Sequence, residues 1–385
     1  MSLSTVNLPP LLFFFYFPFF SFSLPISGQP SNPAVGVTYN SGATHLHRPE
    51  RVATVLHSLN LERVRIQVPN PDVIRAFSYS GISLLLSIPN SLIPEMASNQ
   101  SNAQRWLSDH VFPFYPRSRI TTISVGNDVL DSSPRLANFL PHAMRNVHEA
   151  LHKLGIRKVS VSTTFSFGNA ITTAFPPSAA QFQESITESL VKPVLDFLAA
   201  TNSSFLINLY PYKLYRSDPE IPIGFALFQE QPFNFRDDMM SGVRYRNLFD
   251  VMVDAVISAM ELAGYMDIPV IVTETGWPTR GGANEVEASM TYAEMYVDGL
   301  VRHLKAGIGT PLRREGVAET YVFELFDKDT EQGGAESEYQ WGILYPNMTK
   351  KYGFDFSGSV RVGGIDGVLI ILLACWLLLS LEWKR

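Results

Sequence analysis

Cysteine is almost absent from this 385-residue chain: the one cysteine, Cys375, lies in an apolar stretch near the C-terminus. The rest of the chain therefore has no disulfide, no thiolate nucleophile and no cysteine-based zinc or iron–sulfur site. Histidines are also few, and none of them shows the paired spacing of a metal site. We expect no metal, and we expect core packing rather than covalent links to stabilise the fold.

Basic residues are fewer than acidic ones, 30 against 36, which gives a net charge of −6. Proteins that bind nucleic acid carry basic stripes, so nucleic acid is not an expected partner. The chain has no Gly-x-Gly-x-x-Gly or P-loop motif, so no nucleotide cofactor is implied. It also has no Gly-x-Ser-x-Gly elbow, which argues against a serine hydrolase.

An apolar run lies near the N-terminus. Leu11–Leu24 is almost wholly apolar and is followed by the small residues Ser27 and Gly28, as in a cleaved signal peptide. The segment before the run lacks the usual Lys or Arg, so an N-terminal membrane anchor is the alternative. We assign residues 1–30 to a signal peptide.

A second apolar run lies near the C-terminus. Small residues at 357–359, a short spacer and the run Val368–Leu381 resemble a GPI-attachment signal. The run is shorter than the about 20 residues that span a bilayer, yet Glu382–Arg385 resembles the flank of a single-pass anchor, which is the alternative. We expect residues 357–385 to hold a secreted protein at the outer face of the plasma membrane or in the cell wall. Three Asn-x-Ser/Thr sequons, at Asn99, Asn202 and Asn347, fit a glycoprotein.

Between these ends, residues 31–356 alternate between strand-type and helix-type segments. The strand-type segments are rich in β-branched and aromatic residues, and they are Val35–Tyr39, Arg63–Val68, Ile82–Ile88, Ile120–Gly126, Lys158–Thr164, Phe205–Tyr210, Ile268–Glu274 and Thr320–Phe326. The helix-type segments are Arg48–Leu59, Pro71–Ser78, Gln104–Val111, Pro134–Leu154, Ser189–Ala200, Leu248–Ala263 and Val286–Gly307. Eight such repeats predict an α/β fold, a single-domain (β/α)₈ TIM barrel. The irregular segment 212–246 is expected to be an insertion that walls the cleft.

Two of the predicted strands lead into carboxylates. The apolar run Ile268–Glu274 stops at Glu274, and the fourth strand leads into Asn127 and Asp128. The carboxyl ends of barrel strands share one face, so Asp128 and Glu274 are expected to meet there. Two carboxylates suit glycosidic bond cleavage, where one protonates the leaving oxygen and the other attacks the anomeric carbon. The alternative is that Glu274 caps a helix or pairs with an arginine.

Aromatic and amide side chains near these carboxylates fit a sugar ligand. Trp277 follows Glu274 by three residues and offers a face for a sugar ring, and Asn127 can hold a sugar hydroxyl. Tyr39 and Tyr210 lie at the ends of predicted strands, where they line the cleft or pack in the barrel rim.

These features resemble the plant β-1,3-glucanases of glycoside hydrolase family 17. The resemblance runs from about Val35 to Phe354. Its motifs are Val35-Gly-Val-Thr-Tyr39, Pro71-Asp72-Val-Ile-Arg75-Ala-Phe77, Ser124-Val-Gly-Asn127-Asp128, Asn208-Leu-Tyr210-Pro-Tyr212, Thr273-Glu274-Thr-Gly-Trp277-Pro278, Gly309-Thr-Pro311, Phe323-Glu-Leu-Phe326 and Trp341-Gly342. Thr-Glu-Thr-Gly-Trp-Pro in that order is the most specific of these motifs.

The resemblance implies a function and a set of site residues. It implies retaining cleavage of internal β-1,3-glucan bonds, including those of callose, with Glu274 as the nucleophile. It further implies a sugar cleft lined by Tyr39, Asn127, Tyr210, Trp277, Phe326 and Glu338. We expect a monomer that needs no cofactor and whose partner is β-1,3-glucan polysaccharide.

The chain departs from the family pattern around the proton donor. The family has a glutamate directly after the asparagine, where this chain has Asp128. The missing methylene withdraws the carboxyl by about 1.5 Å, and such a misplacement can cost on the order of a hundredfold in rate. Lys328 and Glu331 exchange the charges usual in the family, and Val68 replaces an aspartate common in relatives.

Two hypotheses of different classes follow from this departure. In the first, the protein is a β-1,3-glucan hydrolase or transglycosylase, with reduced activity, that uses Asp128 as its acid and base. In the second, it is a catalytically impaired cell-wall β-1,3-glucan binding protein.

Overall fold

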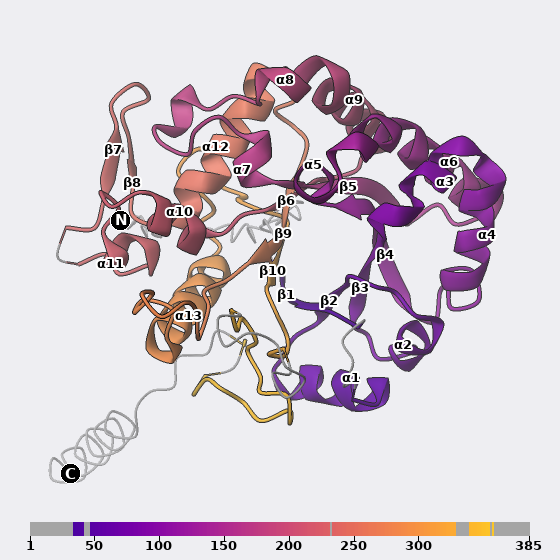
Figure 1. The fold of residues 1–385 in the computed structure, drawn as a ribbon, viewed down its shortest axis with the longest axis horizontal. Coiled ribbons are helices and arrows are strands. Elements are labelled where there is room, and N and C mark those ends of the chain that lie inside the picture. The colour runs from indigo at the N-terminus through magenta and orange to yellow at the C-terminus, as the bar shows by residue number, and fades with distance from the viewer. Residues whose placement is uncertain (1–33, 42–46, 232, 329–338, 355, 358–385) are drawn as a thin grey trace, which may run out of the picture. The chain divides into compact units, whose positions relative to one another are not determined.

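Eight parallel strands close into a barrel, with helices around it (Figure 1). The computed structural model describes residues 34–41, 47–231, 233–328, 339–354 and 356–357. In order around the barrel, the strands are β1 (Ala34–Tyr39), β10 (Glu319–Val322), β9 (Val270–Thr275), β6 (Phe205–Asn208), β5 (Ser160–Ser166), β4 (Arg119–Asn127), β3 (Ser83–Ile88) and β2 (Arg63–Ile66). Each of the eight predicted strands overlaps one of these, so the predicted TIM barrel is confirmed.

The helices between the strands largely follow the predicted segments. They include α1 (Pro49–Ser58), α2 (Pro71–Ala76), α3 (Ile93–Ser98), α4 (Gln100–His110), α6 (Leu140–Lys153), α9 (Lys192–Thr201), α12 (Leu248–Leu262) and α13 (Met290–Ala306). Helix α13 begins after Ser289, whose side chain accepts the Tyr292 N–H, and ends at Gly307 with φ +64°. The sequence analysis placed that end correctly, because a glycine in the left-handed region stops a helix, but it did not predict α3.

Alternation along each strand separates the inside of the barrel from its outside. Leu84 and Leu86 of β3 belong to the large core between strands and helices, whereas Leu85 belongs to a second cluster. That cluster joins Leu85 to Leu206, Ile271 and Tyr321 from three other strands. Successive side chains of a strand point to opposite faces, so these four residues fill the barrel interior.

The segment 212–246 contains regular structure that the sequence analysis did not predict. It includes α10 (Pro211–Ser217), α11 (Ile223–Ala226) and the antiparallel hairpin of β7 (Arg236–Asp238) and β8 (Val243–Tyr245). The buried Asp238 carboxylate ties the hairpin to the barrel, since it accepts hydrogen bonds from the backbone N–H and hydroxyl of Ser178. The part of this segment that reaches the cleft is α10, which carries Tyr212, Lys213 and Arg216.

The predicted signal peptide, residues 1–30, and the predicted attachment segment from residue 358 onward lie outside the described residues. Within the described part of the chain, no helix has the length and apolarity needed to cross a membrane. The three sequon asparagines, Asn99, Asn202 and Asn347, are all exposed.

Candidate active site

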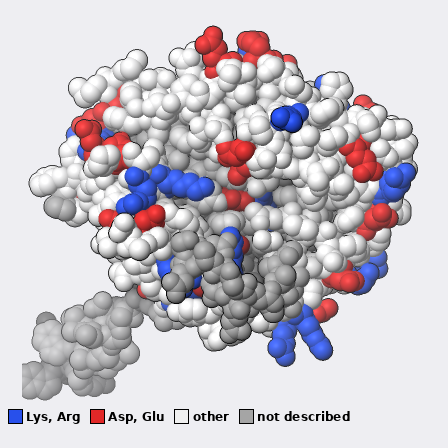
Figure 2. Space-filling model, in the orientation of Figure 1, with Lys and Arg blue, Asp and Glu red and all other residues white. Residues whose placement is uncertain are grey.

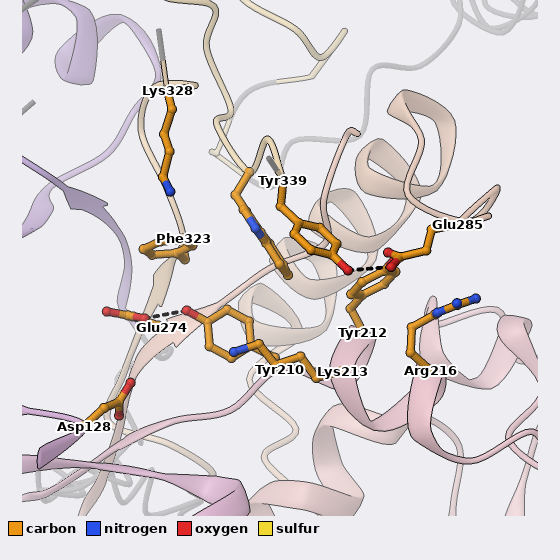
Figure 3. Close-up of a pocket in the computed structure, with 11 residues that line it drawn as sticks. Asp128, Tyr210, Tyr212, Lys213, Arg216, Glu274, Glu285, Phe323, Lys328 and Tyr339 are labelled. Carbon is orange, nitrogen blue, oxygen red and sulfur yellow. Dashed lines mark hydrogen bonds between the residues drawn. The ribbon is translucent and has the colours of Figure 1, made fainter. Parts of the chain in front are cut away.

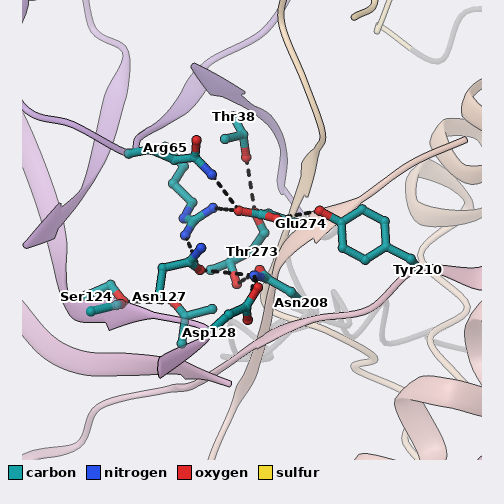
Figure 4. A network of polar contacts seen from close by, with 12 residues as sticks. Thr38, Arg65, Ser124, Asn127, Asp128, Asn208, Tyr210, Thr273 and Glu274 are labelled. Carbon is teal, nitrogen blue, oxygen red and sulfur yellow. Dashed lines mark hydrogen bonds and ion pairs between the residues drawn. The ribbon is translucent and has the colours of Figure 1, made fainter. Parts of the chain in front are cut away.

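Glu274 lies near the carboxyl end of β9, with 4% of its surface exposed. Its carboxylate accepts hydrogen bonds from three side chains. The Arg65 guanidinium and the Gln67 amide both donate to Oε1, the amide at 2.7 Å, and the Tyr210 hydroxyl donates to Oε2 (Figure 4). Arg65 is fully buried, and its other nitrogen Nη2 donates to Oδ1 of Asn127 at 2.7 Å. Glu274 therefore pairs with an arginine, as the alternative interpretation held, and it also faces a cleft.

Asp128 follows the last residue of β4, at a turn that needs a particular backbone. Gly126 has φ +80°, and a Cβ there would lie 2.8 Å from side-chain atoms of both Ile93 and Val129. Asp128 itself is left-handed, with φ +46° and ψ +47°. Aspartate tolerates this conformation better than most residues. The turn brings the carboxyl group of Asp128 over the mouth of the barrel.

The carboxylate of Asp128 is held by Asn208, the last residue of β6. Nδ2 of Asn208 lies 3.0 Å from Oδ1 and 2.9 Å from Oδ2 of Asp128, and it also donates to Asn127. The hydroxyl of Thr273 donates to Oδ1 of Asn208 at 2.8 Å, which fixes the orientation of the amide. In the strand register, Asn208 lies opposite Glu274. Asn208 therefore joins Asp128 to Asn127, which in turn accepts from the arginine that pairs with Glu274.

The pKa of Asp128 is raised to about 6, first by burial and then by the negative charge of Glu274. The hydrogen bond from Asn208 and the charge of Arg65 act in the opposite direction. A carboxyl group with this pKa carries a proton at mildly acidic pH, as a general acid must. Two carboxyl groups in unlike surroundings, one paired with the buried Arg65 and one able to hold a proton, are the arrangement that divides acid and nucleophile.

Both carboxylates line one open cleft with a volume of about 500 Å³ (Figure 3). The rest of its lining is aromatic and charged, namely Tyr210, Tyr212, Lys213, Arg216, Glu285, Phe323, Lys328, Tyr339 and Trp341. A second hollow of about 340 Å³ also borders Asp128, together with Asp131 and Ser166. Figure 2 shows acidic side chains near the middle of this face, with lysine and arginine side chains beside them. The cleft continues past Asp128 and is not a closed pocket.

Among the predicted site residues, Tyr210 bonds Glu274 directly. Asn127 accepts from Arg65, which also donates to Glu274, and from Asn208, which also donates to Asp128. Tyr39 and Trp277 are each 1% exposed. Trp277 donates from Nε1 to the backbone oxygen of Glu287 and packs its ring against Tyr212, with centroids 4.9 Å apart. The structure thus places Trp277 beneath the aromatic wall of the cleft, and its direct contact with a sugar stays a prediction.

Of the remaining predicted site residues, the structure describes Phe326. Phe326 is half-buried and contacts the rings of Tyr39 and His47, with centroids 6.2 and 5.4 Å apart. Burial raises the pKa of Tyr39 to about 12. Glu338 and Glu331 lie outside the described residues, and Val68, which was noted for replacing an aspartate, is 46% exposed.

A buried ion pair joins Asp327 to Lys351, with Nζ and Oδ2 2.6 Å apart. Burial raises the pKa of the Asp327 carboxyl, and burial likewise lowers the pKa of the Lys351 ammonium. This pair was not predicted from the sequence, where the exchanged charges at Lys328 and Glu331 were noted instead.

Four residues of the site were not assigned from the sequence. They are Arg65 in β2, Gln67 directly after β2, Asn208 at the end of β6, and Lys213 in α10. The ammonium of Lys213 lies 4.2 Å from the ring centroid of Tyr210. Arg65 carried a signal, because a charged side chain lies inside a predicted strand, between Val64 and Ile66. In the described part of the chain, no group of three His, Cys, Asp or Glu side chains could hold a metal ion.

A TIM barrel with two carboxylates at the carboxyl ends of its strands is the architecture of many glycoside hydrolases. The family model described as glycosyl hydrolases family 17 matches residues 35–356, and the chain belongs to that family. The predicted family and fold are both confirmed.

Relatives and solved structures agree with this assignment. The Arabidopsis thaliana proteins named glucan endo-1,3-beta-glucosidase 12 and 13 are 37% and 38% identical to this chain. Each match covers 84% of this chain. The chain spans 60% and 64% of the lengths of those two proteins. CJP38, a beta-1,3-glucanase and allergen of Cryptomeria japonica pollen, has a similar structure, with a TM-score of 0.78 and 35% identity over 84% of this chain and 99% of CJP38. A plant beta-glucan endohydrolase structure gives a TM-score of 0.74 and 31% identity, over 83% of this chain and 99% of the other.

Proposed function

We propose that this protein is a retaining glycoside hydrolase that cleaves internal β-1,3-glucosidic bonds of cell-wall glucan such as callose. The observation that carries the proposal is that Asp128 and Glu274, 146 residues apart in the sequence, line the same open cleft beside an aromatic wall. The names of the relatives support the β-1,3-glucan substrate. The hollow on the far side of Asp128 supports cleavage within a chain rather than at its end.

The proposed reaction has two displacement steps. In the first, Glu274 attacks the anomeric carbon, the bond to the leaving glucan breaks, and the leaving oxygen takes the proton of Asp128. The ester that forms removes the negative charge of Glu274, which is one of the two main causes of the raised pKa of Asp128. That pKa then falls, so Asp128 is ready to act as base. In the second step it takes a proton from water, the water oxygen attacks the same carbon, and the electron pair of the ester bond returns to Glu274.

A glucan-binding role without turnover is the second candidate function. It is favoured by one observation: both oxygens of Asp128 face the amide of Asn208, which stabilises the ionised form rather than the acid. Against it, burial and Glu274 raise the pKa of Asp128 enough for the residue to hold a proton at mildly acidic pH.

Hydrolysis of laminarin by residues 31–356, compared with an Asp128→Glu variant, separates the two candidates. We expect the wild-type protein to release oligosaccharides. If only the variant releases sugar, the natural chain is not a hydrolase. If neither does and both bind laminarin, the defect includes the Lys328 side of the cleft.

The pH dependence of the reaction is expected to report Asp128. Above about pH 6, kcat/KM on laminarin should fall about tenfold per pH unit, because the free enzyme loses the proton that the leaving oxygen needs. Asp128→Asn should lower kcat/KM by roughly 10²- to 10⁴-fold and should abolish this basic limb. The measurement is a pH–rate profile from pH 4 to 8 for both proteins. A basic limb that persists in Asp128→Asn would assign the proton to another group.

We further propose that the protein is secreted, carries N-glycans and is a monomer attached to the outer face of the plasma membrane by a GPI anchor. The apolar runs at Leu11–Leu24 and Val368–Leu381 and the three exposed sequon asparagines support this proposal. Release of the protein from membranes by a phosphatidylinositol-specific phospholipase tests the anchor. Retention after that treatment would favour a single-pass helix.

A further inference from the structure

The two oxygens of the Glu274 carboxylate have unequal surroundings. Oε1 accepts from the buried guanidinium of Arg65 and from the Gln67 amide, with Nε2 of Gln67 at 2.7 Å. Oε2 accepts from the Tyr210 hydroxyl, and Tyr210 lines the cleft (Figure 3). A carboxylate oxygen has two lone-pair directions, so Oε2 keeps one free for a substrate, whereas both directions at Oε1 are occupied.

The position of Gln67 in the fold lets it maintain the difference between Oε1 and Oε2. It directly follows β2, and its backbone N–H donates to the oxygen of Tyr39 at 3.3 Å, which extends the strand ladder by one residue. Arg65 and Gln67 are two residues apart on an extended backbone, so their side chains project on the same side of the strand. Arg65 is fully buried and Gln67 is half-buried, so Gln67 is the more exposed of the two donors to Oε1.

We propose that Gln67 is a positioning residue, which together with Arg65 holds Oε1 of Glu274 as the spectator oxygen and leaves Oε2 to form and break the bond to the sugar. This inference rests on the proposed hydrolase function. In the first step, Oε2 gives an electron pair to the anomeric carbon, the bond from that carbon to the leaving oxygen breaks, and Oε1 becomes the carbonyl oxygen of the ester. In the second step, water gives a proton to Asp128 and its oxygen attacks that carbon, the bond from the carbon to Oε2 breaks, and the electron pair of that bond returns to the carboxylate.

The two steps depend differently on the Gln67 amide. Negative charge leaves the carboxylate in the first step and returns to it in the second, so a donor to Oε1 assists the second step most. Loss of the amide therefore slows breakdown of the glycosyl-enzyme more than its formation. A change that only loosened the site would instead weaken substrate binding and raise KM.

The test uses 2,4-dinitrophenyl β-laminaribioside and a Gln67→Met variant. This leaving group departs without a proton, so breakdown of the glycosyl-enzyme limits kcat. We expect Gln67→Met to lower kcat and KM together by about tenfold, roughly the effect of losing one hydrogen bond to a charged group, and to leave kcat/KM nearly unchanged. Mass spectrometry of the quenched reaction should show more enzyme carrying a disaccharide than in the wild type.

Two further variants control this measurement. Gln67→Asn keeps an amide but shortens the side chain by one methylene, and it should behave like Gln67→Met. Gln183→Met removes an amide that donates to the backbone oxygen of Ile171 at 3.1 Å, away from the residues that line the cleft, and it should match the wild type in kcat and KM.

The possible outcomes separate this inference from the function on which it rests. An active wild type with unchanged kcat and KM in Gln67→Met, or with a raised KM, overturns the role of Gln67 and leaves the hydrolase intact. A wild-type protein that releases no dinitrophenol and forms no covalent adduct overturns the proposed function, and the role of Gln67 with it.

Discussion

Replacing Glu274 with glutamine is expected to lower kcat/KM on laminarin by at least about 10⁴-fold, because the amide cannot form the glycosyl-enzyme. Glutamine has the same shape as glutamate, so the cleft keeps its lining. The measurement is the release of reducing sugar by purified variant and wild type at pH 5, where Asp128 of the wild type, with its pKa of about 6, is mostly protonated.

A rescue experiment tests the nucleophile more sharply. Glu274→Ala leaves space on the face from which the carboxylate attacks, and azide entering there should give a sugar azide of inverted, α configuration from an activated aryl laminaribioside. Glu149→Gln is a suitable control, because Glu149 is exposed and accepts its hydrogen bond from Gln100 on the surface. A Glu274→Gln variant that retained a tenth of the wild-type rate would show that the nucleophile is another group.

A second large effect is expected on the stability of the fold when Arg65 is replaced. Arg65→Met is expected to lower the free energy of unfolding by roughly 3–5 kcal/mol, because it leaves the Glu274 carboxylate buried without its main cationic partner. The corresponding fall in Tm is roughly 5–15 °C. Thermal and urea unfolding of the two proteins at one pH measure the change.

The double variant Arg65→Met, Glu274→Gln completes a cycle for this ion pair. Because it removes both charges, it should recover much of the stability that Arg65→Met loses. If the double variant were less stable than the wild type by the sum of the two single-variant effects, the two side chains would not interact energetically, and the described pair would not be what holds Glu274.

Much of the architecture could be predicted from the sequence, because local pattern decides it. Val270–Thr275 is β-branched at five of its six positions and stops at a glycine, so its identity as a buried strand needed no knowledge of its neighbours. The predicted ends of the helices and strands were less accurate than their existence and type. The predicted helix 286–307 begins at Met290, after the cap at Ser289, and predicted strand Phe205–Tyr210 ends at Asn208, because the chain turns into α10 at Pro211.

The site was predicted only in part. Asp128 and Glu274 could be found because each stands at the carboxyl end of a strand-type run, where a carboxylate is conspicuous. Arg65 and Asn208 act through hydrogen bonds to residues 209 and 80 positions away, and no spacing along the chain indicates such partners. For Trp277, a specific sequence motif predicted a direct contact with sugar. The structure shows that its side chain is 1% exposed and packs against Tyr212, so that contact stays a prediction.

The amino-acid sequence by itself determined the barrel, the family and the two carboxylates, since these follow from the strand–helix alternation and from which residues end the strands. Only the tertiary structure decided how those carboxylates are held, because closing the barrel brings β2, β4, β6 and β9 to one rim. There Arg65 and Gln67 donate to Glu274, and Asn208 donates to Asp128. Burial and the charge of a neighbour then set the protonation of Asp128, and both exist only once the chain has folded.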